Sequence, residues 1–262
     1  MTTTPERAAD ALARLYDLDL SEDPGDLDLY LALATRTGGP ILEMAVGTGR
    51  LAVPLADGGY TVTGVDLDPA MLARARRAAD AAGKAVARRL TLVEGDARTV
   101  RLPAAGSFRL ASIPLNSIFL MGTRADQAAA VATLAAHLAP GGIAVVDAWL
   151  PDADDLSRYD GRVVLEWVRE EPGTGRVVTK TGSAAYDAAT GVVHLTTIFE
   201  AGLSGEPAVR WVRADRLRLV GPDELASFAE SAGLVVEQLA GGYDLEPLGP
   251  GADRVVLVAR RR

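Results

Sequence analysis

The sequence contains no cysteine and only two histidines among its 262 residues. The lack of cysteine excludes disulfide bonds, thiolate metal sites and a cysteine nucleophile. Two histidines far apart in the sequence leave only carboxylates as metal ligands, so no metal site is expected. No apolar stretch is long enough to span a membrane, and the first residues lack the basic start and apolar centre of a secretion signal. We therefore expect a cytoplasmic protein.

Positive charge is also scarce. The chain has 27 Lys and Arg against 35 Asp and Glu, which gives a formal net charge of −8. An acidic protein is poorly suited to bind a phosphate backbone without sequence specificity. Hydrophobic residues make up 48% and charged residues 24%, as in ordinary globular proteins. These values favour a small-molecule partner over nucleic acid or membrane.

Apolar strands alternate with amphipathic helices over residues 41–148, after a helical region that ends near Arg36. Alternation with short turns predicts a parallel, doubly wound sheet. The expected strands are Ile41–Ala45, Tyr60–Val65, Leu90–Val93, Phe108–Ile113 and Ile143–Ala148. The expected helices between them are Arg50–Asp57, Pro69–Ala82 and Ala125–Leu138. Two strands at the C-terminus bring the sheet to seven.

The pattern changes after Leu150. Four strand-like segments are separated by the turn sequences "PGTG", "DAATG" and "SGEP", which are typical of hairpins. We therefore expect residues 1–150 and 220–262 to form an α/β core with an N-terminal helical lid. Residues 151–219 are expected to form an inserted antiparallel β subdomain that covers the substrate.

A glycine turn, "GTGRLA" at residues 47–52, follows the first strand and opens a helix. Glycines let the backbone approach a ligand, and the helix start directs N–H groups towards it. Asp66 follows roughly twenty residues later, where an acid that binds ribose is expected. Taken alone, these features leave a nicotinamide dinucleotide open as the ligand.

Two further acids change this interpretation. Glu43 precedes the glycine turn, where a carboxylate would repel a pyrophosphate but attract an ammonium group. Asp96 follows the third strand and offers a carboxylate to an adenine amino group. An amino-acid end, a ribose and an adenine together describe S-adenosylmethionine (SAM).

The sequence resembles the class I SAM-dependent methyltransferases. The resemblance lies in "ILEMAVGTGR", "GVDLDPAML", "VEGDAR" and "LAPGGIAVVD", which occur in that order. It implies the Rossmann-like seven-stranded fold of that family, with S-adenosylhomocysteine as the product. Ala45 is a departure, because the family usually has glycine at this position. We expect binding to survive, since alanine is also small.

The resemblance implies a role for each matching residue. Glu43 would hold the methionine amino group and Asp66 the ribose hydroxyls, while Asp96 and the backbone of Ala97 would meet the adenine edge. Tyr16 resembles a tyrosine that closes over the methionine end in relatives with a helical N-terminal lid. The remaining expected cofactor contacts are Ala45, Gly47, Thr48, Gly49, Arg50, Leu67, Met71 and Leu115.

The inserted segment resembles the lid of small-molecule N-methyltransferases that act on amino sugars or glycine. With Tyr16, the candidate catalytic residues are His194, on an inserted strand, and Asn116, beyond the fourth strand. The acceptor is expected to be a small molecule of specialised metabolism, methylated on N or O, and the enzyme is expected to form a homodimer. Three alternatives stay open: a methyltransferase-like cyclase, a nicotinamide-dependent oxidoreductase and a non-catalytic SAM-binding protein.

Overall fold

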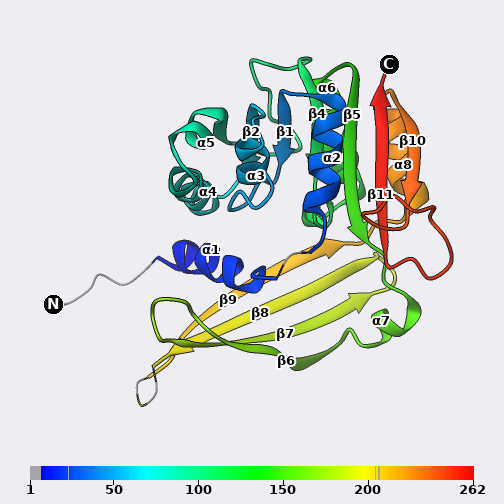
Figure 1. The fold of residues 1–262 in the computed structure, drawn as a ribbon. Coiled ribbons are helices and arrows are strands. Elements are labelled where there is room, and N and C mark those ends of the chain that lie inside the picture. Colours follow the sequence, from blue (N-terminus) through cyan, green and yellow to red (C-terminus); the bar gives the residue numbers. More distant parts are fainter. Residues whose placement is uncertain (1–6, 23, 204, 206) are drawn as a thin grey trace. The chain divides into compact units, whose positions relative to one another are not determined.

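A computed structural model describes residues 7–22, 24–203, 205 and 207–262 of the chain. The described residues divide into two compact units. The core unit comprises residues 24–152 and 220–262, and the inserted unit comprises residues 7–22 and 153–219. Each unit has its own β-sheet (Figure 1).

The core unit contains a seven-stranded sheet with the order β10-β11-β5-β4-β1-β2-β3. Strands β1 to β5 are parallel, whereas β11 lies antiparallel between β5 and β10. The strands are β1 (Ile41–Met44), β2 (Val62–Asp66), β3 (Leu90–Glu94), β4 (Phe108–Ile113), β5 (Leu138–Trp149), β10 (Leu234–Ala240) and β11 (Arg254–Arg261). The expected doubly wound, seven-stranded sheet is confirmed.

Helices connect the parallel strands and cover both faces of this sheet (Figure 1). They are α2 (Leu27–Thr37), α3 (Ala52–Asp57), α4 (Pro69–Ala82), α5 (Lys84–Arg89), α6 (Arg124–His137) and α8 (Pro222–Ser231), with a 3₁₀ turn η1 (Ser117–Met121). Residues of α2, α3 and α4 share one apolar cluster with β1 and β2, while α6 packs against α8. Pattern analysis missed α5 and η1, because a helix of five or six residues is too short to show a hydrophobic period.

Gly64 lets the glycine turn pack against the sheet. It lies on β2, opposite Glu43 of β1. A methyl group placed on its Cα would lie only 2.7 Å from Cγ2 of Val46, the residue just before Gly47. The backbone N–H of Val46 also donates a 2.9 Å hydrogen bond to the carbonyl of Val65. The missing side chain at Gly64 therefore fixes where the turn leaves the sheet.

The inserted unit is an antiparallel sheet with a helix on one face. Its strands occur in chain order, β6 (Asp160–Glu170), β7 (Val177–Asp187), β8 (Val192–Gly202) and β9 (Val209–Arg218). The unit also contains α1 (Ala8–Asp19) and the short α7 (Ala153–Ser157). Pattern analysis missed α7, because its five residues are too few to show a hydrophobic period.

In the structure, α1 belongs to the same compact unit as the inserted sheet, whereas the expected division placed the N-terminal helix with the core. Ala11 and Leu15 of α1 are buried in a small apolar cluster with Phe199 and Trp211 of the inserted sheet. Asp19 accepts hydrogen bonds from Trp167 Nε1 at 2.9 Å and Lys180 Nζ at 2.7 Å. The helix groups with the insertion because its apolar face needs that sheet for burial, a long-range partner that local periodicity does not reveal.

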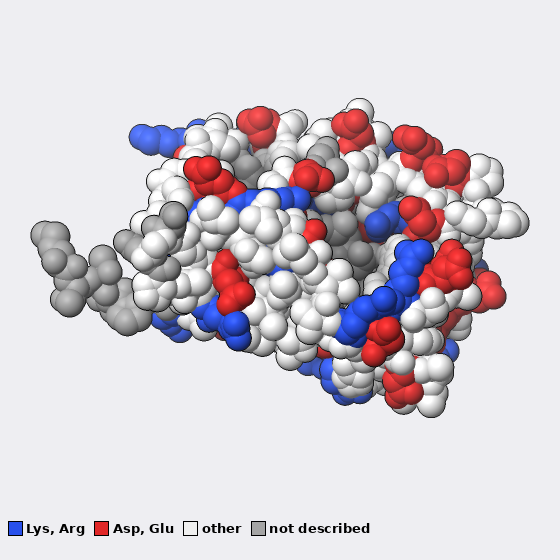
Figure 2. Space-filling model, turned by 90° about the horizontal axis from the view of Figure 1, so that it is seen from below, with Lys and Arg blue, Asp and Glu red and all other residues white. Residues whose placement is uncertain are grey.

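Charges of both signs are interspersed on the face shown in Figure 2, with broad uncharged areas between them. Among the helices described, none is long and apolar enough to cross a membrane.

Replacing Gly64 with alanine should destabilise the protein by about 1–3 kcal/mol, because the new methyl group overlaps Val46. Chemical denaturation measures this loss. Gly249→Ala is the matched control, since the nearest atom to a Cβ added there is the carbonyl oxygen of Pro247, at an ordinary contact distance of 3.9 Å. Val46→Ala in the Gly64→Ala background should recover part of the loss, and strictly additive effects would contradict the overlap.

Candidate active site

The carboxyl ends of the parallel strands carry the residues that the sequence indicated. The strand order places β1 and β4 side by side, with β2 and β3 beyond one and β5 beyond the other. The chain therefore reverses its direction of winding between β1 and β4, the usual ligand position in a sheet of this type. Loops after β1, β2 and β3 form one half of this edge, and loops after β4 and β5 form the other.

The turn after β1 has three residues with positive φ: Ala45 (56°), Gly47 (55°) and Gly49 (88°). This conformation favours glycine, because a Cβ crowds the backbone there. It explains why a glycine is usual at the position of Ala45, where this chain accepts some strain. Gly49 also packs closely, since an added Cβ would lie 3.2 Å from the Cβ of Ala75.

Asp66 closes the glycine turn. One of its carboxylate oxygens, Oδ2, accepts a 2.8 Å hydrogen bond from the N–H of Gly47, and the other, Oδ1, accepts a 2.9 Å bond from the N–H of Asp68. Burial raises the pKa of Asp66, although these backbone donors oppose the shift. Each oxygen keeps a second lone pair, so the carboxylate can still accept hydroxyl donors.

Glu43 is the most unusual group at this edge. It is 3% exposed, and its Oε2 is the only buried side-chain N or O atom without a hydrogen-bond partner among the residues described. Burial raises the pKa of Glu43 to about 8, despite the opposing influence of Arg50. An unpaired buried carboxylate is costly, and a cationic donor is the kind of ligand that offsets this cost.

Arg50 is paired with a residue that the sequence did not indicate. Its Nη1 and Nη2 donate to Oδ1 and Oδ2 of the fully buried Asp26, at 2.5 and 2.7 Å. This two-point pair joins the segment before α2 to the glycine turn. Arg50 as a cofactor contact stays a prediction, since much of its guanidinium is engaged by Asp26.

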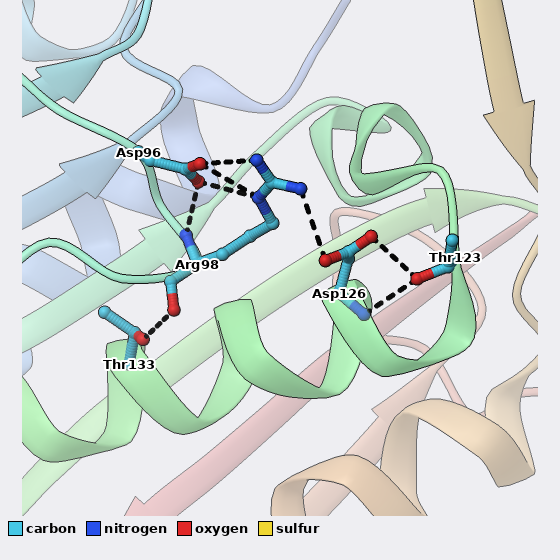
Figure 3. Close-up of polar contacts among 5 residues, drawn as sticks. All are labelled: Asp96, Arg98, Thr123, Asp126 and Thr133. Atoms are coloured by element: carbon cyan, nitrogen blue, oxygen red, sulfur yellow. Dashed lines mark hydrogen bonds and ion pairs between the residues drawn. The ribbon is translucent and has the colours of Figure 1, made fainter.

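Asp96 lies after β3 and is held by Arg98 (Figure 3). The Arg98 guanidinium lowers the pKa of the Asp96 carboxyl, which therefore stays ionised. Arg98 Nη1 also donates to Asp126 Oδ1 at 3.2 Å. The sequence did not indicate this pair, although the two residues are separated by a single alanine.

Asp147, near the end of β5, is a fully buried carboxylate that accepts hydrogen bonds from four residues. The hydroxyls of Tyr30 and Tyr243 donate at 2.9 and 3.0 Å, and Nη1 of Arg254 donates at 3.0 Å. The N–H of Leu115 donates to both oxygens, at 3.0 and 3.1 Å. Burial still raises the pKa of Asp147. Its donors come from distant parts of the chain, so no local sequence signal predicted them.

The turn after β4 depends on Asp147. Leu115 and Asn116 both have positive φ, 49° and 63°, which is costly for side chains of this size. Asn116 Oδ1 accepts a 2.6 Å hydrogen bond from the N–H of Trp149. This bond fastens the tip of β4 to the tip of β5. A catalytic role for Asn116 stays a prediction, and the structure adds this structural one.

The expected adenine-flanking residues differ in exposure. Leu67, directly after Asp66, is 66% exposed, whereas Met71 and Ala97 are buried at 9% and 8%. An exposed leucine beside the ribose-binding candidate is suited to a flat apolar ligand surface. These three assignments stay predictions.

Tyr16 and His194 belong to the inserted unit. Tyr16 is half-buried on α1, and His194 is exposed on β8. Neighbouring residues of β8 alternate between faces, so His194 lies on the face opposite Leu195 and Phe199. Leu195 lines a cavity on the α1 side of the sheet, and His194 does not. This placement gives no support to His194 as a base in that cavity, and the role of Tyr16 stays a prediction.

Comparison with known proteins identifies the class. A family described as a methyltransferase domain matches residues 41–142. The dTDP-3-amino-3,4,6-trideoxy-alpha-D-glucopyranose N,N-dimethyltransferase of Streptomyces venezuelae is 31% identical over 71% of this chain and 83% of that protein. A cypemycin N-terminal methyltransferase from a Streptomyces species is 26% identical over 86% of this chain and 84% of that protein. The chain therefore belongs to the SAM-dependent methyltransferases.

A solved structure extends this likeness to the whole fold. DesVI from Streptomyces venezuelae superposes with a TM-score of 0.75 at 25% identity, over 99% of this chain and 100% of that one. The protein is thus a class I methyltransferase enzyme with SAM as its cofactor. The unpartnered Oε2 of Glu43 fits this cofactor, because SAM carries an ammonium group.

Binding of S-adenosylhomocysteine at pH 7 should release about one proton. Glu43 has a pKa of about 8 without ligand, so it is mostly protonated at pH 7 and must ionise to pair with the ligand ammonium. Titration calorimetry in two buffers of different ionisation enthalpy measures this release. Glu43→Gln should abolish it and weaken binding roughly 10- to 100-fold, by loss of a charge-assisted bond. Wild-type binding without proton release would contradict the assignment.

Arg254→Met should lower the free energy of unfolding by about 3–5 kcal/mol near pH 8, because it leaves the buried Asp147 carboxylate without its cation. Burial already raises the Asp147 pKa, and losing the cation raises it further. A group with a raised folded-state pKa loses its stabilising contribution as pH rises through that pKa. The loss should therefore be smaller near pH 5. Chemical denaturation of the wild type and Arg254→Met at pH 8 and pH 5 measures the two losses. Tyr30→Phe is the control, because it removes a neutral donor from Asp147. Equal losses in Arg254→Met at the two pH values would contradict the prediction.

Proposed function

We propose that this enzyme transfers methyl groups from SAM to the amine nitrogen of a small molecule, in particular an amino sugar carried on a nucleotide. The observation that carries the proposal is the 31% identity, over 83% of its length, to an amino-sugar N,N-dimethyltransferase. A second N,N-dimethyltransferase, named for dTDP-3-amino-3,6-dideoxy-alpha-D-glucopyranose, is 32% identical over 53% of this chain.

Four groups at the carboxyl edge would hold the cofactor. Glu43 is assigned to the methionine ammonium, and the open backbone at Gly47 and Gly49 to close approach of the ligand. Asp66 is assigned to the ribose hydroxyls, for which it keeps free lone pairs, and Asp96 to the adenine amino group. Bound SAM supplies an electrophilic methyl group on a sulfonium, and the protein's task is to align the acceptor with it.

The environment at the tips of β4 and β5 supports nitrogen over oxygen. Among the residues described there, Asp147 and Asn116 are the acceptor side chains nearest the strand ends, and both already bond to the protein. A hydroxyl acceptor gains from a base that removes its proton during transfer. A neutral amine attacks with its own lone pair and loses its proton afterwards to solvent.

The inserted unit offers space for an acceptor. A cavity of about 710 Å³ lies on its sheet, lined by Arg158, Tyr159, Arg162, Glu166, Lys180 and five further small or apolar residues. This volume is within the range of small-molecule sites. Its arginines suit a phosphorylated acceptor, although Arg162 also lies 3.2 Å from Asp160.

A paired-substrate assay tests the function. The purified enzyme is incubated with SAM and either a dTDP-linked 3-amino-deoxysugar or its 3-hydroxy counterpart, and products are followed by mass spectrometry. We expect one or two methyl groups on the amine, with one S-adenosylhomocysteine formed per methyl group, and no change in the hydroxyl compound.

Asp66→Ala serves as the cofactor-site control and should weaken SAM binding at least tenfold, by loss of charge-assisted hydrogen bonds of about 1.5–3 kcal/mol each. Methylation of the hydroxyl compound would contradict the proposed nitrogen acceptor. Rearrangement of a substrate without formation of S-adenosylhomocysteine would instead indicate a cyclase. Methylation only of a peptide N-terminus would retain the amine but exclude the sugar.

A further inference from the structure

Arg98 makes an unusually complete set of contacts with Asp96. Its Nε lies 2.9 Å from Oδ1 and 3.0 Å from Oδ2, and its Nη2 lies 2.5 Å from Oδ2. Its backbone N–H also donates to Oδ1 at 2.9 Å. The carboxylate is therefore fixed in orientation by both the main chain and the side chain of one residue.

Arg98 is in turn held by helix α6 at two points (Figure 3). Its Nη1 donates to Asp126 in the first turn of α6, and its carbonyl oxygen accepts a 2.7 Å hydrogen bond from Thr133 Oγ1. Asp126 is itself fixed, because Thr123 Oγ1 donates to its Oδ2 at 2.7 Å and accepts from its N–H at 3.1 Å.

Helix α6 provides a rigid support for this arrangement. Its residues Ala130, Val131 and Leu134 are fully buried, and it packs against β4, β5 and α8. Asp96, by contrast, lies in a loop and is one-quarter exposed at its side chain. Without the Arg98 side chain, the only contact left to the carboxylate among the residues described would be the backbone N–H of residue 98 on Oδ1, which leaves Oδ2 unheld.

We propose that Arg98 is a positioning residue. Anchored to helix α6, it orients the Asp96 carboxylate and so determines the enzyme's preference for a 6-amino purine in its cofactor. The proposal rests on the assignment of Asp96 to the adenine edge. Since the Nε hydrogen is shared between both oxygens, Oδ2 has room for one more donor. An ionised carboxylate only accepts hydrogen bonds, so a 6-amino group suits it and a 6-oxo group is repelled.

Two ligands that differ only at this position test the inference. Dissociation constants are measured by calorimetry for S-adenosylhomocysteine and S-inosylhomocysteine. The wild-type enzyme should bind the adenosine form at least tenfold more tightly. Arg98→Met should weaken binding of the adenosine form about tenfold and bring the ratio of the two constants close to one, while turnover at saturating SAM changes less than threefold.

Arg101→Met is the matched control, because Arg101 is exposed in the same loop and should leave both constants unchanged. Asp126→Asn weakens one anchor of Arg98 and should lower the ratio by a smaller factor. This second variant keeps the test decisive if Arg98→Met does not fold.

The outcomes separate two kinds of failure. If Asp96→Ala leaves the ratio unchanged, Asp96 does not contact the purine 6-position, and the site assignment fails together with the inference. If Asp96→Ala removes the preference but Arg98→Met keeps it, Arg98 does not position Asp96. Equal weakening of both ligands in Arg98→Met indicates a structural role only, and it too would overturn the inference.

Discussion

The buried, unpartnered carboxylate of Glu43 is the constraint on which the rest of the core unit depends. A charge in a low-dielectric interior is unfavourable unless a donor meets it, and the part of the chain that the structure describes offers none to Oε2. Because of this cost, the pKa of Glu43 is raised and the carboxyl keeps its proton to a higher pH. Stability is thereby lost as pH rises from 4.5, the ordinary value, through about 8, and a cationic ligand restores it. The site is thus built for a ligand that brings positive charge.

The three strand-tip acids of the cofactor half have different environments, and the differences match the groups assigned to them. Glu43 is buried and lacks a partner for one oxygen, which suits an ammonium. Asp66 is held by backbone N–H groups and keeps lone pairs for hydroxyls. Asp96 is one-quarter exposed at its side chain and is paired with Arg98, which suits an uncharged amino group.

Local patterns were sufficient to predict the fold, and they named acids that the structure places at the carboxyl edge of the sheet. Strand–helix alternation predicted the sheet, and acids in or just after the last residues of three successive strands pointed to Glu43, Asp66 and Asp96. Helix Pro69–Ala82 was predicted with its observed bounds, because Pro69 marks its first turn. The missed features all need contacts between distant segments: Asp26 with Arg50, Arg254 with Asp147, and α1 with the inserted sheet.

The acceptor half of the edge is organised on a different principle from the cofactor half. Its main carboxylate, Asp147, is saturated by two tyrosines, an arginine and a backbone N–H, and so has a framework role. In return it holds Leu115 and Asn116 in a left-handed conformation that the chain would otherwise avoid. These bonds fix the tip of β4 relative to the tip of β5. For an in-line transfer to an amine, such fixed geometry contributes more than a base, since the nucleophile needs no proton removed before it reacts.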